Sequence, residues 1–333
     1  MSRRSASKAL VIGASGHLGN AIVRALLDRK YDITACSRRR VPPANLSGLP
    51  VRYAAGDTET AGQLDRWIAG HDLVVDAAAP YPLDAFSPVS NAGNDPIAYA
   101  ERRTRQLLST VSRHKARLVY VGSFVTQVRP DTGVQRFEHQ MMRWAHPYFE
   151  VKRLIETQIL DASRRGLPVV IANPTYCLGP WDMRDRHLCT IPLLLRGEIP
   201  SSITQLVNVV DVRDVAAGIV AALDAELYGE PIQVSGHNIS TKELYSLICE
   251  IAGVPPPRFT IAGSFAIAGA YVSELMLTAI GEKTTLPAGG MMMATLFDYM
   301  HASQQLQELG VTPRPLSESV TDAIKWYRRI GYC

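Results

Sequence analysis

The stretch that decides the fold lies near the start of the chain and reads ALVIGASGHLGNAIVRALL, residues 9–27. Its first four residues form a short apolar run, as expected of a strand that is buried on both faces. Glycines follow at Gly13, Gly16 and Gly19, and the apolar residues after them recur at helical spacing. A strand, a glycine turn and a helix in this order are typical of a dinucleotide-binding unit, because the helix N-terminus attracts a pyrophosphate.

Each glycine of this turn has its own expected role. Gly13 permits the tight turn, Gly16 lets the backbone approach the pyrophosphate, and Gly19 allows the helix to pack closely on the strand. The remaining residues of the turn that we assign to the cofactor site are Ser15, His17 and Leu18. His17 is interpreted as a tolerated loop residue and not as a catalytic acid.

The end of the second predicted strand, residues 32–37, indicates which dinucleotide is bound. The residues there are Ser37, Arg38, Arg39 and Arg40. An NAD site usually places a carboxylate at this position for the ribose hydroxyls, whereas a 2′-phosphate needs cationic or hydroxyl partners. Arg38, assisted by Ser37, is the best candidate for that phosphate, so the sequence favours NADP over NAD. The alternative is a solvated basic loop.

Three further places along the chain are candidates for cofactor contacts. Asp57 is placed to meet the adenine amino group, although an ordinary capping role fits it nearly as well. The small residues Ala77, Ala78 and Ala79 end the predicted strand 73–78 and leave room for a cofactor; they would equally permit tight packing. Past the predicted strand 167–172, the turn at Asn173 and Pro174 is placed to present its backbone to the carboxamide, with Thr175 and Tyr176 close by.

Three residues form the candidate catalytic set. Tyr148 and Lys152 are separated by four positions and therefore share one face of a predicted helix. An ammonium beside a phenol favours the phenolate, which suits the phenol to move a proton. Ser123 follows the predicted strand 118–122 at its carboxyl end, where open α/β sheets bind ligands. We expect Ser123 to orient a carbonyl towards Tyr148, although by itself an ordinary turn residue is an equal alternative; Thr126 is a weaker substitute.

Strands and helices alternate through the first half of the chain, with predicted helices at about residues 98–114 and from about residue 148. This alternation predicts an α/β fold, a Rossmann-like doubly wound parallel sheet. We assign residues 1–175 to an NADP-binding domain that carries the Ser-Tyr-Lys set. Residues 176–333 are assigned to a smaller C-terminal substrate-binding lobe.

In the second half of the chain strands and helices no longer alternate regularly, and prolines separate short elements. Short strands are predicted at 207–211 and 231–234, and the chain closes with an amphipathic helix at 320–330. We expect some of these elements to return to the main sheet. The mostly apolar stretch 259–280 predicts a buried or amphipathic pair of helices; a lipid-facing surface is a second interpretation, and a membrane span is not favoured.

Composition narrows the classes of function. A net charge of +4, spread along the chain, is too small for a nucleic-acid groove, which needs a concentrated basic stripe. The five cysteines include no C-x-x-C pair, so neither a disulfide framework nor a zinc site is predicted and a cytoplasmic location is expected. No metal is expected, because His139, His146 and His187 lack ligand spacing with carboxylates or cysteines.

Taken together, these motifs resemble the extended short-chain dehydrogenase/reductase family. The likeness rests on the glycine fingerprint, on Ser123, on Tyr148 with Lys152, and on residues 173–182, which resemble the family's R-P-x-x-x-x-G-P-x-D run. Asn173 stands where that run usually has arginine. Within this family, the overall sequence pattern most resembles the dihydroflavonol-reductase, steroid-dehydrogenase and hopanoid-associated branch.

The resemblance implies an NADP-dependent oxidoreductase that interconverts a hydroxyl and a carbonyl on a small-to-medium, rather hydrophobic substrate. The methionine run 291–293 could add to an apolar cover over such a substrate, although a plain core role is the favoured interpretation. The family resemblance also implies a homodimer built on the helices near 98–114 and 148–164. Two alternatives remain: a sugar-nucleotide epimerase or dehydratase with internal redox, for which Arg184, Arg186 and Arg196 are candidate diphosphate partners, and a non-catalytic sensor that binds NADP(H).

Overall fold

The computed structural model describes residues 6–79, 95–127, 147–281 and 304–333. At its centre is a seven-stranded sheet in which all neighbouring strands are parallel. In spatial order the strands are β10 (Pro231–Val234), β6 (Val169–Pro174), β5 (Arg117–Val121), β4 (Leu73–Asp76), β1 (Lys8–Ile12), β2 (Asp32–Ser37) and β3 (Arg52–Ala55). The predicted doubly wound parallel sheet is confirmed.

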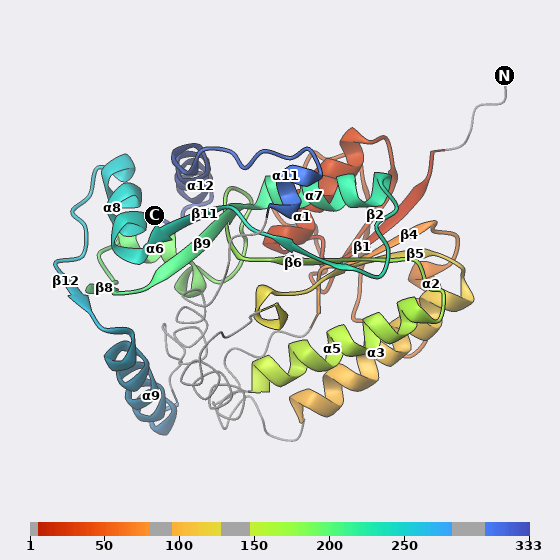
Figure 1. The fold of residues 1–333 in the computed structure, drawn as a ribbon, viewed down its shortest axis with the longest axis horizontal. Helices are drawn as coiled ribbons and strands as arrows, with labels where there is room; N and C mark the ends of the chain where they lie inside the picture. Colours follow the sequence, from red (N-terminus) through yellow and green to blue (C-terminus); the bar gives the residue numbers. More distant parts are fainter. Residues whose placement is uncertain (1–5, 80–94, 128–146, 282–303) are drawn as a thin grey trace.

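Helices cover both faces of this sheet (Figure 1). One face carries α1 (His17–Asp28), α7 (Val212–Asp224) and α11 (Gln305–Glu308), and the other carries α2 (Gln63–Ile68), α3 (Pro96–Arg113) and α5 (Pro147–Arg164). The side chains of β1 show why both faces are covered: Ala9 and Val11 belong to the core on the first face, and Leu10 and Ile12 to the core on the second. Because successive strand residues point to opposite faces, an all-apolar strand needs both layers.

The smaller lobe contains two short sheets and a helical layer. The sheets are β11 (His237–Ser240), β9 (Leu206–Asp211) and β7 (Tyr176–Leu178) in one, and β12 (Phe259–Ile261) with β8 (Ser201–Ile203) in the other. The helices around them are α6 (Thr190–Leu195), α8 (Thr241–Ala252) and α12 (Leu316–Arg329). Strand β10 lies in the main sheet although it follows residue 175, while the division into two domains stays a prediction.

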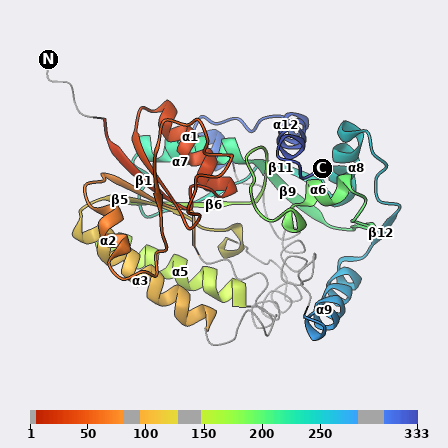
Figure 2. The same cartoon turned by 180° about the vertical axis from the view of Figure 1, so that it is seen from behind.

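The expected pair of helices at 259–280 is wrong. The first three residues form β12, which pairs with β8 and so uses the backbone groups that a helix would need, and a single helix, α9 (Gly263–Ala279), follows. Figure 2 shows α9 below β12, at the lower edge of the view. Its small residues Ala266 and Ala270 are buried, whereas Phe265 is 75% and Leu275 74% exposed.

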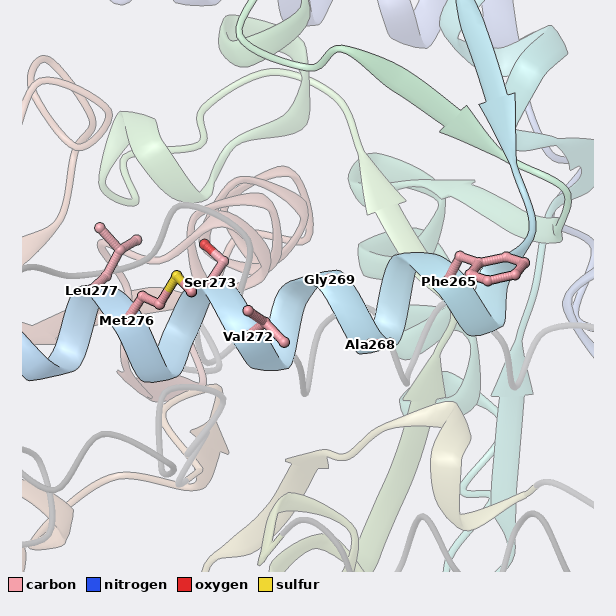
Figure 3. Close-up of a pocket in the computed structure, with 7 residues that line it drawn as sticks. All are labelled: Phe265, Ala268, Gly269, Val272, Ser273, Met276 and Leu277. Carbon is pink, nitrogen blue, oxygen red and sulfur yellow. The ribbon is translucent and has the colours of Figure 1, made fainter.

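The outward face of α9 is therefore apolar. Figure 3 shows a shallow hollow along it, and the described residues that line the hollow all belong to α9, among them Phe265, Val272 and Met276. None of the predicted site residues lines that hollow. Among the residues that the structure describes, no helix combines the length and apolar character needed to cross a membrane. The run 291–293, His139 and His146 lie outside the described residues.

Candidate active site

The candidate site lies where the strand order of the main sheet reverses, between β1 and β4. The turns that follow these two strands flank the crevice in which open α/β sheets bind ligands. Gly13 has a φ of +81°, and a Cβ on it would lie 2.8 Å from the Ala77 carbonyl oxygen and 2.9 Å from Ala78 Cβ. The two turns are thus in close contact, and only glycine fits at position 13.

Helix α1 begins directly at the glycine turn and leaves its N-terminus open. Gly16 is the N-cap residue and has no side chain to accept a hydrogen bond, and the first turn contains no acidic residue. A Cβ on Gly19 would lie 2.1 Å from the Gly13 carbonyl oxygen, so the turn and the helix touch through backbone alone. Backbone N–H groups at such a helix start form a ready site for a pyrophosphate, and the residues present fit one.

Further residues of the turn have defined neighbours. Ser15 Oγ lies 2.8 Å from Ser37 Oγ, which links the turn to the end of β2. Leu18 packs against the core that contains α1. The His17 imidazole is buried, and its Nδ1 lies 4.0 Å from Asp182 Oδ2 in the smaller lobe. Burial lowers the pKa of His17, although the charge of Asp182 opposes that shift, so the ring suits a packing role better than that of an acid.

Asp182 joins distant parts of the chain around His17. Its carboxylate accepts hydrogen bonds from Arg184 at 2.7 Å and from the Tyr327 hydroxyl at 2.9 Å. Its backbone carbonyl accepts one from Trp326 Nε1 at 2.8 Å. The carboxylate is fully buried, so these bonds replace its lost hydration.

The end of β2 presents one hydroxyl and three arginines. Ser37 is buried and its Oγ accepts the Arg39 N–H at 3.3 Å, while the Arg39 guanidinium donates to the Met183 carbonyl oxygen at 3.2 Å. Arg38 is exposed beside Ser37. Asp57 lies after β3, and its Oδ1 accepts the Glu59 N–H at 3.0 Å within a turn. The helix that follows, α2, has Gly62 as its N-cap, so Asp57 does not cap it.

The structure brings the three candidate catalytic residues together. Ser123 follows β5, whereas Tyr148 and Lys152 lie on the buried face of α5. The Tyr148 hydroxyl donates a hydrogen bond of 3.0 Å to Ser123 Oγ. Lys152 Nζ lies 5.9 Å from the centroid of the Tyr148 ring. A hydroxyl, a phenol and an amine thus converge at the carboxyl edge of the sheet.

Two charged residues near Lys152 were not predicted. Asp76, the last residue of β4, accepts two hydrogen bonds of 2.8 Å from Arg103 on α3, and both side chains are almost fully buried. Asp76 Oδ1 also accepts the Ala78 N–H at 3.2 Å. Burial alone would raise the pKa of Asp76, but the charge and hydrogen bonds of Arg103 outweigh burial and lower it. The signal in the sequence was a single carboxylate ending the apolar strand LVVD, which needs a buried partner.

The charges of Asp76 and Arg103 both affect the pKa of Lys152. Burial lowers the pKa of Lys152 to about 8, the charge of Asp76 opposes the shift, and the charge of Arg103 adds to it. A lysine with this pKa is still protonated at neutral pH. It can therefore favour a phenolate on Tyr148 during proton transfer.

The end of β6 contributes residues with structural partners. Pro174 pairs in register with Val234 of β10, and the Thr175 hydroxyl donates to Asn208 Oδ1 at 2.7 Å. Thr126, the weaker substitute for Ser123, donates its hydroxyl proton to Glu156 Oε2 at 2.6 Å. Within the described residues, no group of three or more His, Cys, Asp or Glu is arranged to hold a metal ion.

Comparison with known proteins identifies the family. The model of the NAD dependent epimerase/dehydratase family matches residues 9–235, which span the main sheet from β1 to β10. The chain belongs to this family. Fold and family together define an enzyme of the NAD(P)-dependent oxidoreductase type.

Individual relatives agree with this assignment. A putative dihydroflavonol 4-reductase from Synechocystis sp. is 28% identical, over 97% of this chain and 95% of the relative. Sterol demethylase protein B from Methylococcus capsulatus is 27% identical, over 97% of this chain and 98% of the relative. A nucleoside-diphosphate-sugar epimerase from Pseudomonas aeruginosa shares the fold, with a TM-score of 0.72 and 23% identity over 98% of this chain and 99% of that structure.

Proposed function

We propose that the protein is an NADP-preferring oxidoreductase that interconverts a hydroxyl and a carbonyl on a small-to-medium, rather hydrophobic substrate. The observation that carries this proposal is the 3.0 Å hydrogen bond from Tyr148 to Ser123, with Lys152 beside the same ring. A proton donor, an orienting hydroxyl and a supporting cation lie together at the sheet edge where a dinucleotide site begins. A protein that only binds the cofactor does not need this arrangement.

Each residue has one task in the reduction direction. Ser123 Oγ donates a hydrogen bond to the carbonyl oxygen of the substrate and orients it, and the Tyr148 hydroxyl transfers its proton to the same oxygen. When bound, a reduced nicotinamide supplies the hydride that reaches the carbonyl carbon. Proton and hydride together convert the carbonyl to a hydroxyl. The Lys152 ammonium stabilises the phenolate left on Tyr148 and binds the ribose hydroxyls of the cofactor.

The residues proposed to hold the cofactor follow the crevice from end to end. The α1 N-terminus with Gly13, Gly16 and the rest of the turn binds the pyrophosphate, and Ala77 to Ala79 form the surface beneath it. Arg38 and Ser37 bind the 2′-phosphate, because the end of β2 offers a cation and a hydroxyl and no carboxylate. Asp57, Pro174 and Thr175 complete the proposed set.

The apolar character of the substrate is supported by what surrounds the catalytic residues. Phe124, directly after Ser123, and Phe149, directly after Tyr148, belong to a buried apolar cluster with Leu178. In the smaller lobe Arg184 is paired with Asp182, and Arg196 with Glu198. These two cations are therefore engaged by carboxylates, which argues against their binding a substrate diphosphate. The family description keeps an internal-redox epimerase or dehydratase as the second candidate.

A homodimer through α3 and α5 is part of the proposal. The two helices pack side by side on one face of the sheet (Figure 1). On each helix one exposed arginine pairs within the same helix, Arg105 with Glu101 on α3 and Arg153 with Glu150 on α5. Sedimentation of the wild-type chain and of a variant with Arg105→Glu would test this interface, and a monomeric wild type would exclude it.

The experiment that tests the function is oxidation of NADPH and of NADH against a panel of carbonyls, from small aldehydes through flavonoid and steroid ketones to keto-sugar nucleotides. We expect turnover of an apolar ketone with NADPH. Tyr148→Phe, which deletes only the hydroxyl, is expected to lose this turnover while it still binds NADPH. Full turnover in Tyr148→Phe would contradict the assignment. Tight binding without oxidation of any carbonyl would favour the epimerase or a sensor.

A further inference from the structure

Helix α5 carries a third buried polar residue in line with the catalytic pair. Tyr148, Lys152 and Glu156 follow one another at intervals of four, and all three face the sheet. The Glu156 carboxylate is only 7% exposed, yet its hydrogen-bond donors among the described residues are neutral. These donors are Thr126 Oγ1 at 2.6 Å, Asn173 Nδ2 at 2.7 Å and Gln127 Nε2 at 3.3 Å. A buried carboxylate held in this way has a fixed position, because losing a donor leaves a charge without hydration.

Asn173, near the end of β6, connects this carboxylate to the catalytic serine. Its Nδ2 donates to Glu156, and its Oδ1 accepts the backbone N–H of Ser123 at 3.0 Å. The amide lies directly against the chain before Ser123, since a Cβ on Gly122 would be 2.0 Å from Asn173 Oδ1. Glycine at position 122 therefore leaves the space that the amide occupies.

The two catalytic hydroxyls lie on different elements, Ser123 on the loop after β5 and Tyr148 on α5. The bridge from Glu156 through Asn173 joins the backbone of the first to the helix face of the second. We propose that Asn173 and Glu156 are positioning residues that fix the distance between Ser123 Oγ and the Tyr148 hydroxyl. This inference rests on the proposed function of the Ser-Tyr-Lys set.

The polarity of the bridge makes the inference testable. The amide of Asn173 must accept at Oδ1 and donate at Nδ2, so only one orientation satisfies both neighbours. Asn173→Asp keeps the acceptor for Ser123 but places a second carboxylate against Glu156, which repels it. Adding Glu156→Gln restores a donor opposite the introduced aspartate. The double exchange N173D/E156Q thus keeps one buried carboxylate, one amide and the contact to Ser123, with the two groups interchanged.

The experiment compares the wild type with N173D, E156Q and the double variant, and uses Thr157→Ala as an exposed control on the same helix. For N173D we expect kcat on an apolar ketone to fall by about tenfold or more, since displaced reacting groups lose rate steeply. The Kd for NADPH should stay unchanged, because the bridge does not contact the cofactor turn. In the double variant kcat should return towards that of the wild type, and Thr157→Ala should equal the wild type.

A second measurement needs no turnover. The titration of Tyr148, taken as the ultraviolet difference between each protein and its Tyr148→Phe partner, should shift in N173D and return in the double variant. Unchanged kcat and an unchanged Tyr148 titration in N173D would overturn the inference. A double variant that regained its thermal stability, but neither its kcat nor its Tyr148 titration, would overturn it as well. If the wild type reduced no carbonyl but the titration followed the exchange, the proposed function would fail and the positioning role would stand.

Discussion

Arg103 binds both carboxylate oxygens of Asp76 at 2.8 Å, in the interior of the protein and at the reversal point of the sheet. The same carboxylate accepts the N–H of Ala78, on the turn that contacts Gly13. Arg103 therefore acts on the proposed cofactor surface through Asp76, and its charge also reaches Lys152. One ion pair connects two parts of the candidate site.

Removal of Arg103 should destabilise the protein strongly. Arg103→Leu leaves Asp76 as an unpaired buried charge, which is expected to cost about 3–5 kcal/mol in the free energy of unfolding, measured with urea. The double variant with Asp76→Leu should recover much of this loss. Arg102→Leu is the matched control: Arg102 is exposed and 3.5 Å from Glu59, so its loss should cost about 1 kcal/mol or less. Equal losses for Arg103→Leu and Arg102→Leu would refute this explanation.

Lys152 should give the unfolding free energy a distinctive pH dependence. Its pKa is about 8 in the folded protein and ordinarily 10.5, so between these values the unfolded chain binds more protons. Stability attributable to Lys152 is therefore lowest below pH 8 and rises from about pH 8 to 10.5. The gain should total about 3 kcal/mol relative to Lys152→Met, which lacks the titrating group. A constant difference between the two proteins across this range would disprove the shifted pKa.

The same titration should appear in catalysis, with the opposite consequence. The protonated Lys152 is the form that supports the phenolate, and it is lost as pH rises through about 8. We expect kcat/KM for ketone reduction to fall above that pH in the wild type. Lys152→Arg stays charged, so whatever activity it retains should not fall in this range. A profile that is flat to pH 10 in the wild type would remove Lys152 from the mechanism.

Arg38 should determine the preference between the two cofactors. Arg38→Ala removes the exposed cation beside Ser37, so KM for NADPH should rise by about tenfold, the worth of one hydrogen bond to a charged group. KM for NADH, which lacks the phosphate, should stay the same. Arg40→Ala removes another exposed charge two residues later and serves as the control for general electrostatics. Loss of NADPH preference in Arg40→Ala alone would move the phosphate site to that residue.

Gly19 should not tolerate a methyl group. In Gly19→Ala the new Cβ would lie 2.1 Å from the Gly13 carbonyl oxygen, so either the turn or α1 must move and cofactor affinity should fall sharply. Gly269→Ala on α9 is the control, because within the described part of the chain no atom outside its helix lies within 4 Å of a Cβ added there. That change should leave affinity intact and favour the helix slightly. Isothermal titration with NADPH would measure both, and full affinity in Gly19→Ala would contradict the close contact between turn and helix.

The sequence predicted those parts of the fold in which local pattern and tertiary setting agree. Strands such as LVVD are short, apolar and buried on both faces, and the glycine turn has one dominant structural use. Strand β3 was missed because RYAA is half exposed at the sheet edge and has no apolar run. The prediction of a helix pair at residues 259–280 was wrong because a sequence does not distinguish exposed apolar residues, such as Phe265 and Leu275, from core residues.

The candidate site divides in the same way. Ser123, Tyr148 and Lys152 were identifiable because their spacing is local to one helix and one strand end. Arg103 was not given a role, because its partner Asp76 is distant in sequence and Arg103 lies within no short motif. Asn173 was noticed as a departure from arginine and as part of the turn with Pro174, but its side chain was given no role, because its contact with Ser123 appears only when β5 and β6 are adjacent.

The convergence on Asp182 has a consequence for protein engineering. His17 from the start of the chain, Asp182 from its middle and Tyr327 from its end meet at one buried carboxylate. A chimera that joined the first half of this chain to the second half of a relative would take position 17 from this chain and positions 182 and 327 from the relative. Grafts that exchange substrate preference should therefore carry these positions as one block, together with Trp326, whose indole holds the same segment.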